Sequence, residues 1–197
     1  MSRKYVKHGM TKSRIYAVNE ERTAIFSGCR KYRYVLRIVW DAALPDMQVI
    51  GLNPSTADEI QDDPTVRRCK AFARREGCGG LAMTNLFAFR ATDPKVLKKH
   101  PQPIGEFSFC AFEVTRGKTT HCFASRNDAH LFVTAYRSKV VVAAWGNHGT
   151  HLNRYADVAK LILSAGATLR CFRLTSKGQP EHPLYMPADQ PLIPYER

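Results

Sequence analysis

The chain of 197 residues fits one domain, and its 44% hydrophobic and 10% aromatic residues suffice for a core. Apolar stretches such as residues 140–145 are too short to span a bilayer, and residues 1–10 lack the apolar core of a signal peptide, so we expect a cytoplasmic protein. The net charge of +13 is concentrated in residues 1–37, which carry ten Lys and Arg against two glutamates; this favours a nucleic-acid partner over a terminus that only aids solubility.

The first third of the chain predicts a basic arm, two strands and a polar turn. The arm covers about residues 1–30 and holds short strands. Residues 31–40 (KYRYVLRIVW) partly alternate and are rich in β-formers, which predicts a strand. Residues 47–51 predict a second strand, apolar enough to be central. The turn GLNPST at 51–56 follows at once; it is either an ordinary bend or, in an α/β protein, part of a ligand site.

A helix and a third strand come next. Asp63 and Pro64 are typical of an N-cap and a first helical residue, so a helix should run from there to Gly77. Helical spacing gives it an apolar inner face and a basic outer face: Val66, Cys69, Phe72 and Ala73 inward, and Arg67, Arg68, Arg74 and Arg75 outward. After the break at Gly79-Gly80, residues 81–89 (LAMTNLFAF) predict a strand.

The middle of the chain predicts two helices, an insertion and a strand. Residues 92–100 predict a short helix or turn, and residues 101–124, which have no clear period, a hairpin-like insertion. A helix is expected over residues 125–136, where Asp128 stands three residues after the opening serine as in a capping box. Residues 139–145 are almost continuously apolar and predict a strand.

The last quarter begins with the turn GNHG at residues 146–149. A helix is expected near residues 152–164, with Gly166 as its stop. Residues 167–174 predict the last strand, and the tail from Thr175 is rich in proline.

This alternation predicts an α/β fold: a three-layer αβα sandwich with a central, mainly parallel sheet, in a single domain over residues 1–197. In such a sheet the turns after successive strands line one edge. We therefore expect the segments GLNPST, FRATD and GNHG to converge on one cleft, which the C-terminal segment EHPLYMPAD can join.

Six cysteines lie far apart without a CxxC pair, which argues against a zinc finger and gives no iron–sulfur spacing. Reduced, mostly buried thiols are the simpler interpretation. We expect neither a cofactor nor a metal.

Four short motifs in a fixed order carry a resemblance. They are Gly-x-Asn-Pro at 51–54, TNLF around Asn85, Trp-Gly at 145–146 and His-Pro at 182–183. This series resembles the uracil-DNA glycosylase superfamily. Over residues 48–190, the run from GLNPSTADEIQDDPTVRRC to HPLYMPAD also closely resembles a bacterial and phage family, the domain of unknown function 1643.

The glycosylase resemblance implies a uracil-DNA glycosylase-like fold and a role for each motif. Asn53 stands where a water-holding Asp or Asn belongs, Asn85 where a base is read, and His182 where the catalytic histidine belongs. The wedge that fills the gap in the duplex begins at Leu184 or Tyr185. The loop after the Trp-Gly strand begins at Gly146.

The chemistry of base excision explains these residue types. Cleavage leaves positive charge on the sugar and negative charge on the base, so a water held by Asn53 and a donor at His182 would both help. Because Asn53 cannot act as a full general base, one of the acids that follow it could activate the water. The candidates are Asp58, Asp62 and Asp63. Because Asp63 already has a sufficient role as a helix cap, Asp62 is the freer acid.

Other side chains could bind the rest of the substrate. Phe87 or Phe89 could stack on an extruded base, although at least one of them should belong to the core. Four polar residues of the turns could grip phosphates: Ser55, Thr56, Asn147 and His148.

Three functions fit these features. The first is a DNA glycosylase that removes a modified base, such as a hypermodified phage base, and leaves an abasic site, with a role in antiviral defence. The second is an enzyme that acts on free nucleotides or nucleosides. The third is a non-catalytic protein that binds an extruded base. DNA is the expected partner, with no membrane and no obligate protein partner.

Overall fold

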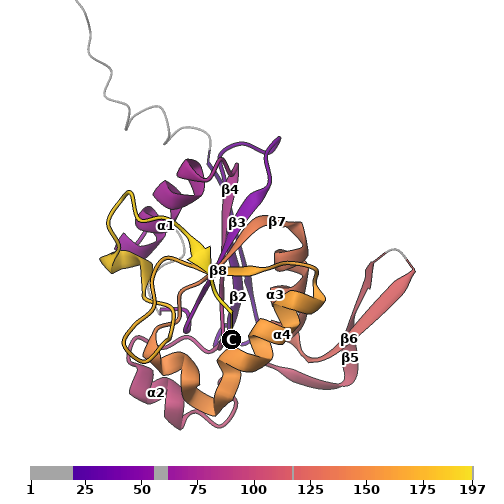
Figure 1. The fold of residues 1–197 in the computed structure, drawn as a ribbon. Coiled ribbons are helices and arrows are strands. Elements are labelled where there is room, and N and C mark those ends of the chain that lie inside the picture. The colour runs from indigo at the N-terminus through magenta and orange to yellow at the C-terminus, as the bar shows by residue number, and fades with distance from the viewer. Residues whose placement is uncertain (1–19, 56–61, 117, 197) are drawn as a thin grey trace, which may run out of the picture.

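A seven-stranded mixed sheet forms the centre of the protein (Figure 1). The computed structural model describes residues 20–55, 62–116 and 118–196. The sheet has the order β1-β2-β4-β3-β7-β8-β9. Its strands are β1 Glu21–Phe26, β2 Arg33–Val39, β3 Asp46–Gly51, β4 Gly80–Asn85, β7 Ser138–Ala143, β8 Leu169–Cys171 and β9 Ile193–Pro194. Neighbours among β4, β3, β7 and β8 are parallel, whereas β1, β2 and β9 join antiparallel.

Helices cover both faces of this sheet, as the alternating pattern predicts (Figure 1). The helical elements are α1 Pro64–Arg75, α2 Pro94–Lys99, α3 Arg126–Arg137 and α4 Arg154–Ser164, with 3-10 turns η1 Asn147–Asn153 and η2 Pro183–Tyr185. On one face α1 packs Phe72 against Phe172, with ring centroids 4.2 Å apart. On the other face Phe132 of α3 and Ile162 of α4 pack on the sheet. The α/β class and the two helical layers are therefore confirmed. None of the described helices is long and apolar enough to cross a membrane.

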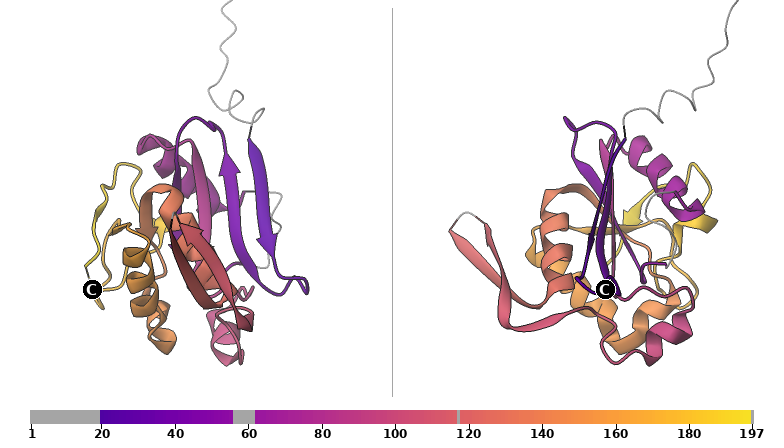
Figure 2. Two further views of the ribbon diagram at one scale, coloured as in Figure 1. Left: turned by 90° about the vertical axis from the view of Figure 1, so that its right-hand side faces the viewer. Right: turned by 180° about the vertical axis from the view of Figure 1, so that it is seen from behind.

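The hairpin-like insertion predicted at 101–124 is a two-stranded hairpin of β5 Phe107–Arg116 and β6 Thr119–Ser125. It projects from the body of the protein beside α3 (Figure 2). The N-cap prediction at α1 is also confirmed, because the Asp63 carboxylate accepts a hydrogen bond of 2.8 Å from the Val66 amide.

Within the predicted N-terminal arm, residues 21–26 form the edge strand β1, in keeping with the short strands expected there; residues 1–19 lie outside the described residues. Two predicted strand boundaries are wrong. The third strand stops at Asn85, because the next amides leave the ladder and follow the turn after β3: Leu86 N–H donates to Gly51 and Phe87 N–H to Leu52. The strand predicted over residues 167–174 shortens to the three residues of β8, Leu169–Cys171, and the short strand β9 that follows it was not predicted.

Two polar predictions are wrong for tertiary reasons. Ser125 is the N-cap of α3 but makes no capping hydrogen bond with its side chain, and Asp128 instead forms an ion pair with Arg154. On α1, Arg68 and Arg74 are half-buried rather than fully outward. The Arg68 guanidinium lies over the Phe72 ring of the same helix, and the Arg74 guanidinium lies over the Trp40 ring.

The chain order places three strand ends together. From β3 the chain crosses to β4 on one side and later returns to β7 on the other side of β3. Gly51 pairs with Asn85 and Ile50 with Ala143, so these carboxyl ends are in register. We call this line of strand ends the carboxyl edge. In open α/β sheets, ligands bind at such a reversal of strand order.

Candidate functional site

Asn85 and Gly51 form the centre of the carboxyl edge. Asn85 is only 5% exposed, yet within the described residues its side-chain amide makes no hydrogen bond. The side-chain oxygen of Asn85 lies so close to Gly51 that a β-carbon built on Gly51 would be 2.9 Å from it. A buried polar group normally has a partner. The glycine therefore leaves room for an amide that is available to a ligand.

Two side chains that the sequence did not single out hold the backbone beneath Asn85. Asn127 donates from Nδ2 to the carbonyls of Asn85 and Leu86, at 3.0 and 3.1 Å. Arg154 donates from Nε to the Leu86 carbonyl at 3.0 Å, and its guanidinium pairs with Asp128. Both are buried, so they fix the end of β4 from α3 and α4. No local pattern signals this role; only their occurrence in apolar helix faces could have raised the question.

Asn53 joins the turn after β3 to the segment after β4. Its Nδ2 donates to the carbonyls of Ala91 at 2.7 Å and Pro54 at 3.2 Å. The side-chain oxygen is the atom left to accept a hydrogen bond, in keeping with the predicted water-holding role. Ser55 follows on the same turn and is half-buried, and Thr56 lies outside the described residues.

His182 lies on the C-terminal segment beside the start of α1. Burial lowers its pKa, and the nearby Asp63 carboxylate raises it only in part. Its Nδ1 accepts a hydrogen bond from the Leu184 amide at 3.4 Å, so the neutral ring carries its proton on Nε2. Leu184 and Tyr185 follow, and they are 39% and 71% exposed. Two exposed apolar side chains beside a neutral imidazole fit the expected wedge.

The loop after β7 connects these parts. Gly146 takes a left-handed backbone (φ +65°) and donates to the Pro180 carbonyl at 2.8 Å, which brings the C-terminal segment to the carboxyl edge. Asn147 and His148 are exposed. The side-chain oxygen of Asn147 accepts from Thr175 at 2.7 Å, and Nδ1 of His148 lies 3.3 Å from the Lys98 ammonium. Asn147 thus retains its amide donors, and His148 has a cation beside it.

Three further predicted residues, Phe87, Phe89 and Asp62, lie in different surroundings. Phe87 is fully buried in the core, 5.5 Å from the His151 ring, so it takes the core role that the sequence left open. Phe89 stands beyond the end of β4 and is half-buried. Asp62 is held in an ion-pair network, with one carboxylate oxygen bound by Arg22 and the other by Lys70 at 2.7 Å. Burial alone would raise the pKa of Asp62, but these two hydrogen bonds outweigh it and lower the pKa.

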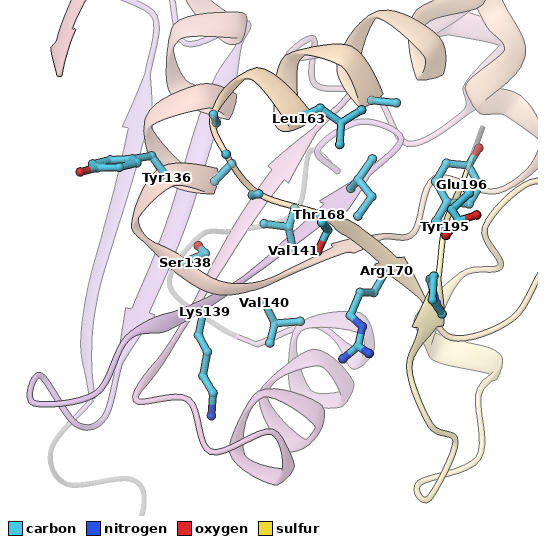
Figure 3. Close-up of a pocket in the computed structure, with 17 residues that line it drawn as sticks. Tyr136, Ser138, Lys139, Val140, Val141, Leu163, Thr168, Arg170, Tyr195 and Glu196 are labelled. Carbon is cyan, nitrogen blue, oxygen red and sulfur yellow. The ribbon is translucent and has the colours of Figure 1, made fainter. Parts of the chain in front are cut away.

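Two cavities accompany the site. The larger, about 940 Å³, lies at the opposite edge of the sheet, around the start of β7, β8 and the C-terminal segment (Figure 3). The smaller, about 450 Å³, lies near the carboxyl edge and is lined by Arg30, Lys31, Phe89, Arg90 and His100. We call it the Phe89 cavity. By size alone, the larger cavity would be the better candidate for a ligand site. The Phe89 cavity adjoins the loop that Asn53 holds and is lined by cations, so its position and charge make it the better candidate.

Across the part of the chain that the structure describes, no group of three or more His, Cys, Asp or Glu side chains is arranged to hold a metal ion. Five cysteines form no disulfide: Cys69, Cys78 and Cys171 are buried, whereas Cys29 and Cys122 are exposed.

Comparison with known proteins gives one match. The model of a family described as a protein of unknown function (DUF1643) matches residues 33–184, which include the whole carboxyl edge. No curated protein and no solved structure matches the chain.

Proposed function

Because the chain belongs to the DUF1643 family, whose description names no activity, we propose from the site itself that it is a DNA glycosylase. It would hydrolyse the bond between the sugar and a modified base and leave an abasic site. The observation that carries this proposal is the buried Asn85 amide, which lacks a hydrogen bond within the described residues and adjoins Gly51 and the Asn53 turn. An amide of this kind suits the polar edge of an extruded base.

The reaction divides between two side chains, Asn53 and His182. The C1′–N bond of the nucleotide breaks with its electron pair going to the base, and a water oxygen bonds to C1′ and then loses a proton to solvent. Asn53 accepts a hydrogen bond from that water, and His182 donates from Nε2 to the departing base anion. A positioned donor of this kind is worth about 3–4 kcal/mol of the barrier. Both carboxylate oxygens of Asp62 are bound, so we assign the water to Asn53 instead.

The neighbouring residues would handle the DNA. Extrusion of a base costs a few kcal/mol. Leu184 and Tyr185 can fill the gap, because both are exposed and lie beside His182. Ser55, Asn147 and His148 can bind phosphates, and the Lys98 ammonium next to His148 adds positive charge. We also propose a uracil-DNA glycosylase-like fold; the order β4-β3-β7-β8 and the four motifs at the carboxyl edge support it.

The resemblance to a bacterial and phage family favours a modified phage base as the substrate. Incubation with DNA from phages that carry different modified bases, followed by alkaline treatment, tests the proposal, because alkali cleaves a strand at an abasic site. We expect cleavage with at least one DNA. Asn53→Ala and His182→Ala should abolish it but retain DNA binding, whereas Lys160→Ala, an exposed residue of α4, should cleave normally. Intact strands throughout the panel, with binding preserved, would instead favour a non-catalytic binder.

A further inference from the structure

The Phe89 cavity is built on a firm frame. Its walls come from the turn between β1 and β2 and from the segment after β4. These two segments are joined by backbone hydrogen bonds: Arg90 N–H donates to Lys31 at 3.0 Å, and Arg33 N–H donates to Ala88 at 2.9 Å. The volume of about 450 Å³ lies within the range of roughly 300–1,000 Å³ that small-molecule sites occupy.

One wall of the Phe89 cavity is aromatic. The Phe89 ring stacks on His100, with centroids 3.8 Å apart and planes 22° apart. Tyr32 meets both rings edge-on, with ring centroids 6.0 and 6.1 Å away. Phe89 and His100 are both half-buried and both line the cavity, so part of the stacked pair is accessible there. Any of the nucleobases can stack on aromatic rings of this kind.

The rest of the lining is cationic. Arg30, Lys31 and Arg90 line the cavity together with the aromatic pair, and none of the described lining residues is acidic. The guanidinium groups of Arg30 and Arg90 lie 4.2 and 5.2 Å from the centre of the Phe26 ring, which orients both. Arg30 also has a left-handed backbone (φ +56°), a costly conformation for a residue other than glycine. Strain of this kind is common where a side chain is held for binding.

The backbone that lines the Phe89 cavity also contacts the proposed excision site. The carbonyls of Phe89 and Ala91 both face the Asn53 amide, at 3.5 and 2.7 Å. The Asn53 turn and the Phe89 cavity therefore share one stretch of backbone. If a DNA strand places one nucleotide at Asn53 and Asn85, the neighbouring nucleotide lies next to this stretch of backbone.

We propose that the Phe89 cavity binds the nucleotide adjacent to the excised one, with its base stacked on Phe89 and His100 and its phosphate against Arg30, Lys31 and Arg90. This assignment rests on the proposed function. It predicts that the protein contacts an unpaired base beside its target, and so favours locally opened DNA over an intact duplex.

Binding of short single strands without any excisable base tests the assignment independently of catalysis. His100→Ala should weaken binding about five- to hundredfold, the scale of one base stacked on a side chain. Arg30→Gln with Lys31→Gln should lower the salt dependence, by about 0.7 in the log–log slope for each lost phosphate contact. The control is Lys160→Gln on α4, which should leave both unchanged.

A ligand change separates stacking from loss of fold. An oligonucleotide that lacks one base at the flanking position should bind the wild type more weakly, but should bind His100→Ala as well as the complete oligonucleotide does. If removal of this base weakens binding equally in the wild type and in His100→Ala, the assignment is overturned. A free deoxymononucleotide that binds as tightly as the strand would also overturn it, because the site would then serve free nucleotides. If these binding results hold but no DNA yields abasic sites, the proposed function fails while the Phe89 cavity remains a nucleotide site.

Thiol labelling locates the bound strand in the unmodified protein. Cys29 is exposed and adjoins Arg30, whereas Cys122 is exposed on the projecting hairpin. A bound oligonucleotide should slow alkylation of Cys29 and leave that of Cys122 unchanged, as measured by mass spectrometry. Equal rates at Cys29 with and without saturating DNA would count against the assignment.

Discussion

Gly51→Ala tests the central contact of the carboxyl edge. A β-carbon at residue 51 would lie 2.9 Å from the side-chain oxygen of Asn85, and the next atoms, Asn85 Cγ and the Thr84 carbonyl, are 4.0 Å away. The Gly51 backbone is outside the left-handed region, so alanine fits its conformation. The change therefore acts on one flexible amide and on little else.

The size of the effect follows from this distance. Carbon–oxygen contact requires the Asn85 oxygen to move by about 0.5 Å. The rotamer strain of about 0.5–1.5 kcal/mol is offset by the roughly 0.4–1 kcal/mol that Gly→Ala gains through the unfolded chain. Stability should thus hardly change. If a misplacement of about 1 Å costs a factor of about 100 in rate, half of it costs about tenfold.

Thermal unfolding and single-turnover excision measure the two quantities separately. Gly28→Ala is the matched control, because a β-carbon there would meet no atom within 4 Å. In an Asn85→Ala background, Gly51→Ala should cause no further loss, since the oxygen that it displaces is gone. Full excision by the single variant, or an undiminished loss in that background, would refute the role of Asn85.

Three further predictions concern stability and the water-positioning group. Burial lowers the pKa of His130 to about 4, below its unfolded value near 6.5. The stability that the neutral ring contributes is therefore present above pH 6.5 and is lost as the pH falls toward 4. In urea titrations, His130→Phe should reduce the difference in unfolding free energy between pH 7 and pH 4.5 by about 2–3 kcal/mol, and an unchanged difference would contradict this. Asn127→Ala removes the side-chain donor to the Asn85 carbonyl, whereas the Leu86 carbonyl keeps its hydrogen bond from Arg154; the change should cost about 1–3 kcal/mol in chemical denaturation, and a loss below about 0.5 kcal/mol would deny its supporting role. Asp62→Asn should lower stability by about 1–3 kcal/mol because it weakens the pair with Lys70, yet keep excision; loss of excision in the folded variant would make Asp62 the general base.

The sequence predicted the fold where local signals and burial agree. Asp63 and Pro64 place the start of α1 correctly, because a cap is a local contact between neighbouring residues. The end of β4 was misplaced because the apolar run continues to Phe89 although the ladder stops at Asn85. Leu86 and Phe87 are buried by packing beneath a loop, and hydrophobicity alone does not distinguish that from a strand.

The site was predictable only in part, for a similar reason. The order of motifs along parallel strands sets which residues reach the carboxyl edge, and this placed Asn53 and Asn85 on adjoining segments. Asn127 and Arg154 could not be found this way, because they act across the sheet on backbone carbonyls that carry no side-chain signal. His100 meets Phe89 only through the tertiary fold.

The contacts of Asn53 bear on why an amide, rather than a carboxylate, occupies this position. Its Nδ2 faces the carbonyls of Ala91, Pro54 and Phe89, so a carboxylate there would put an oxygen 2.7 Å from another oxygen. The loop that shapes the site thus requires a donor, and a donor cannot be a base. If the protein is the proposed glycosylase, water at Asn53 is held rather than deprotonated. Its rate would then depend largely on how well the leaving base is stabilised, and the greater share of catalysis would fall to His182, whose proton the Leu184 amide directs to Nε2.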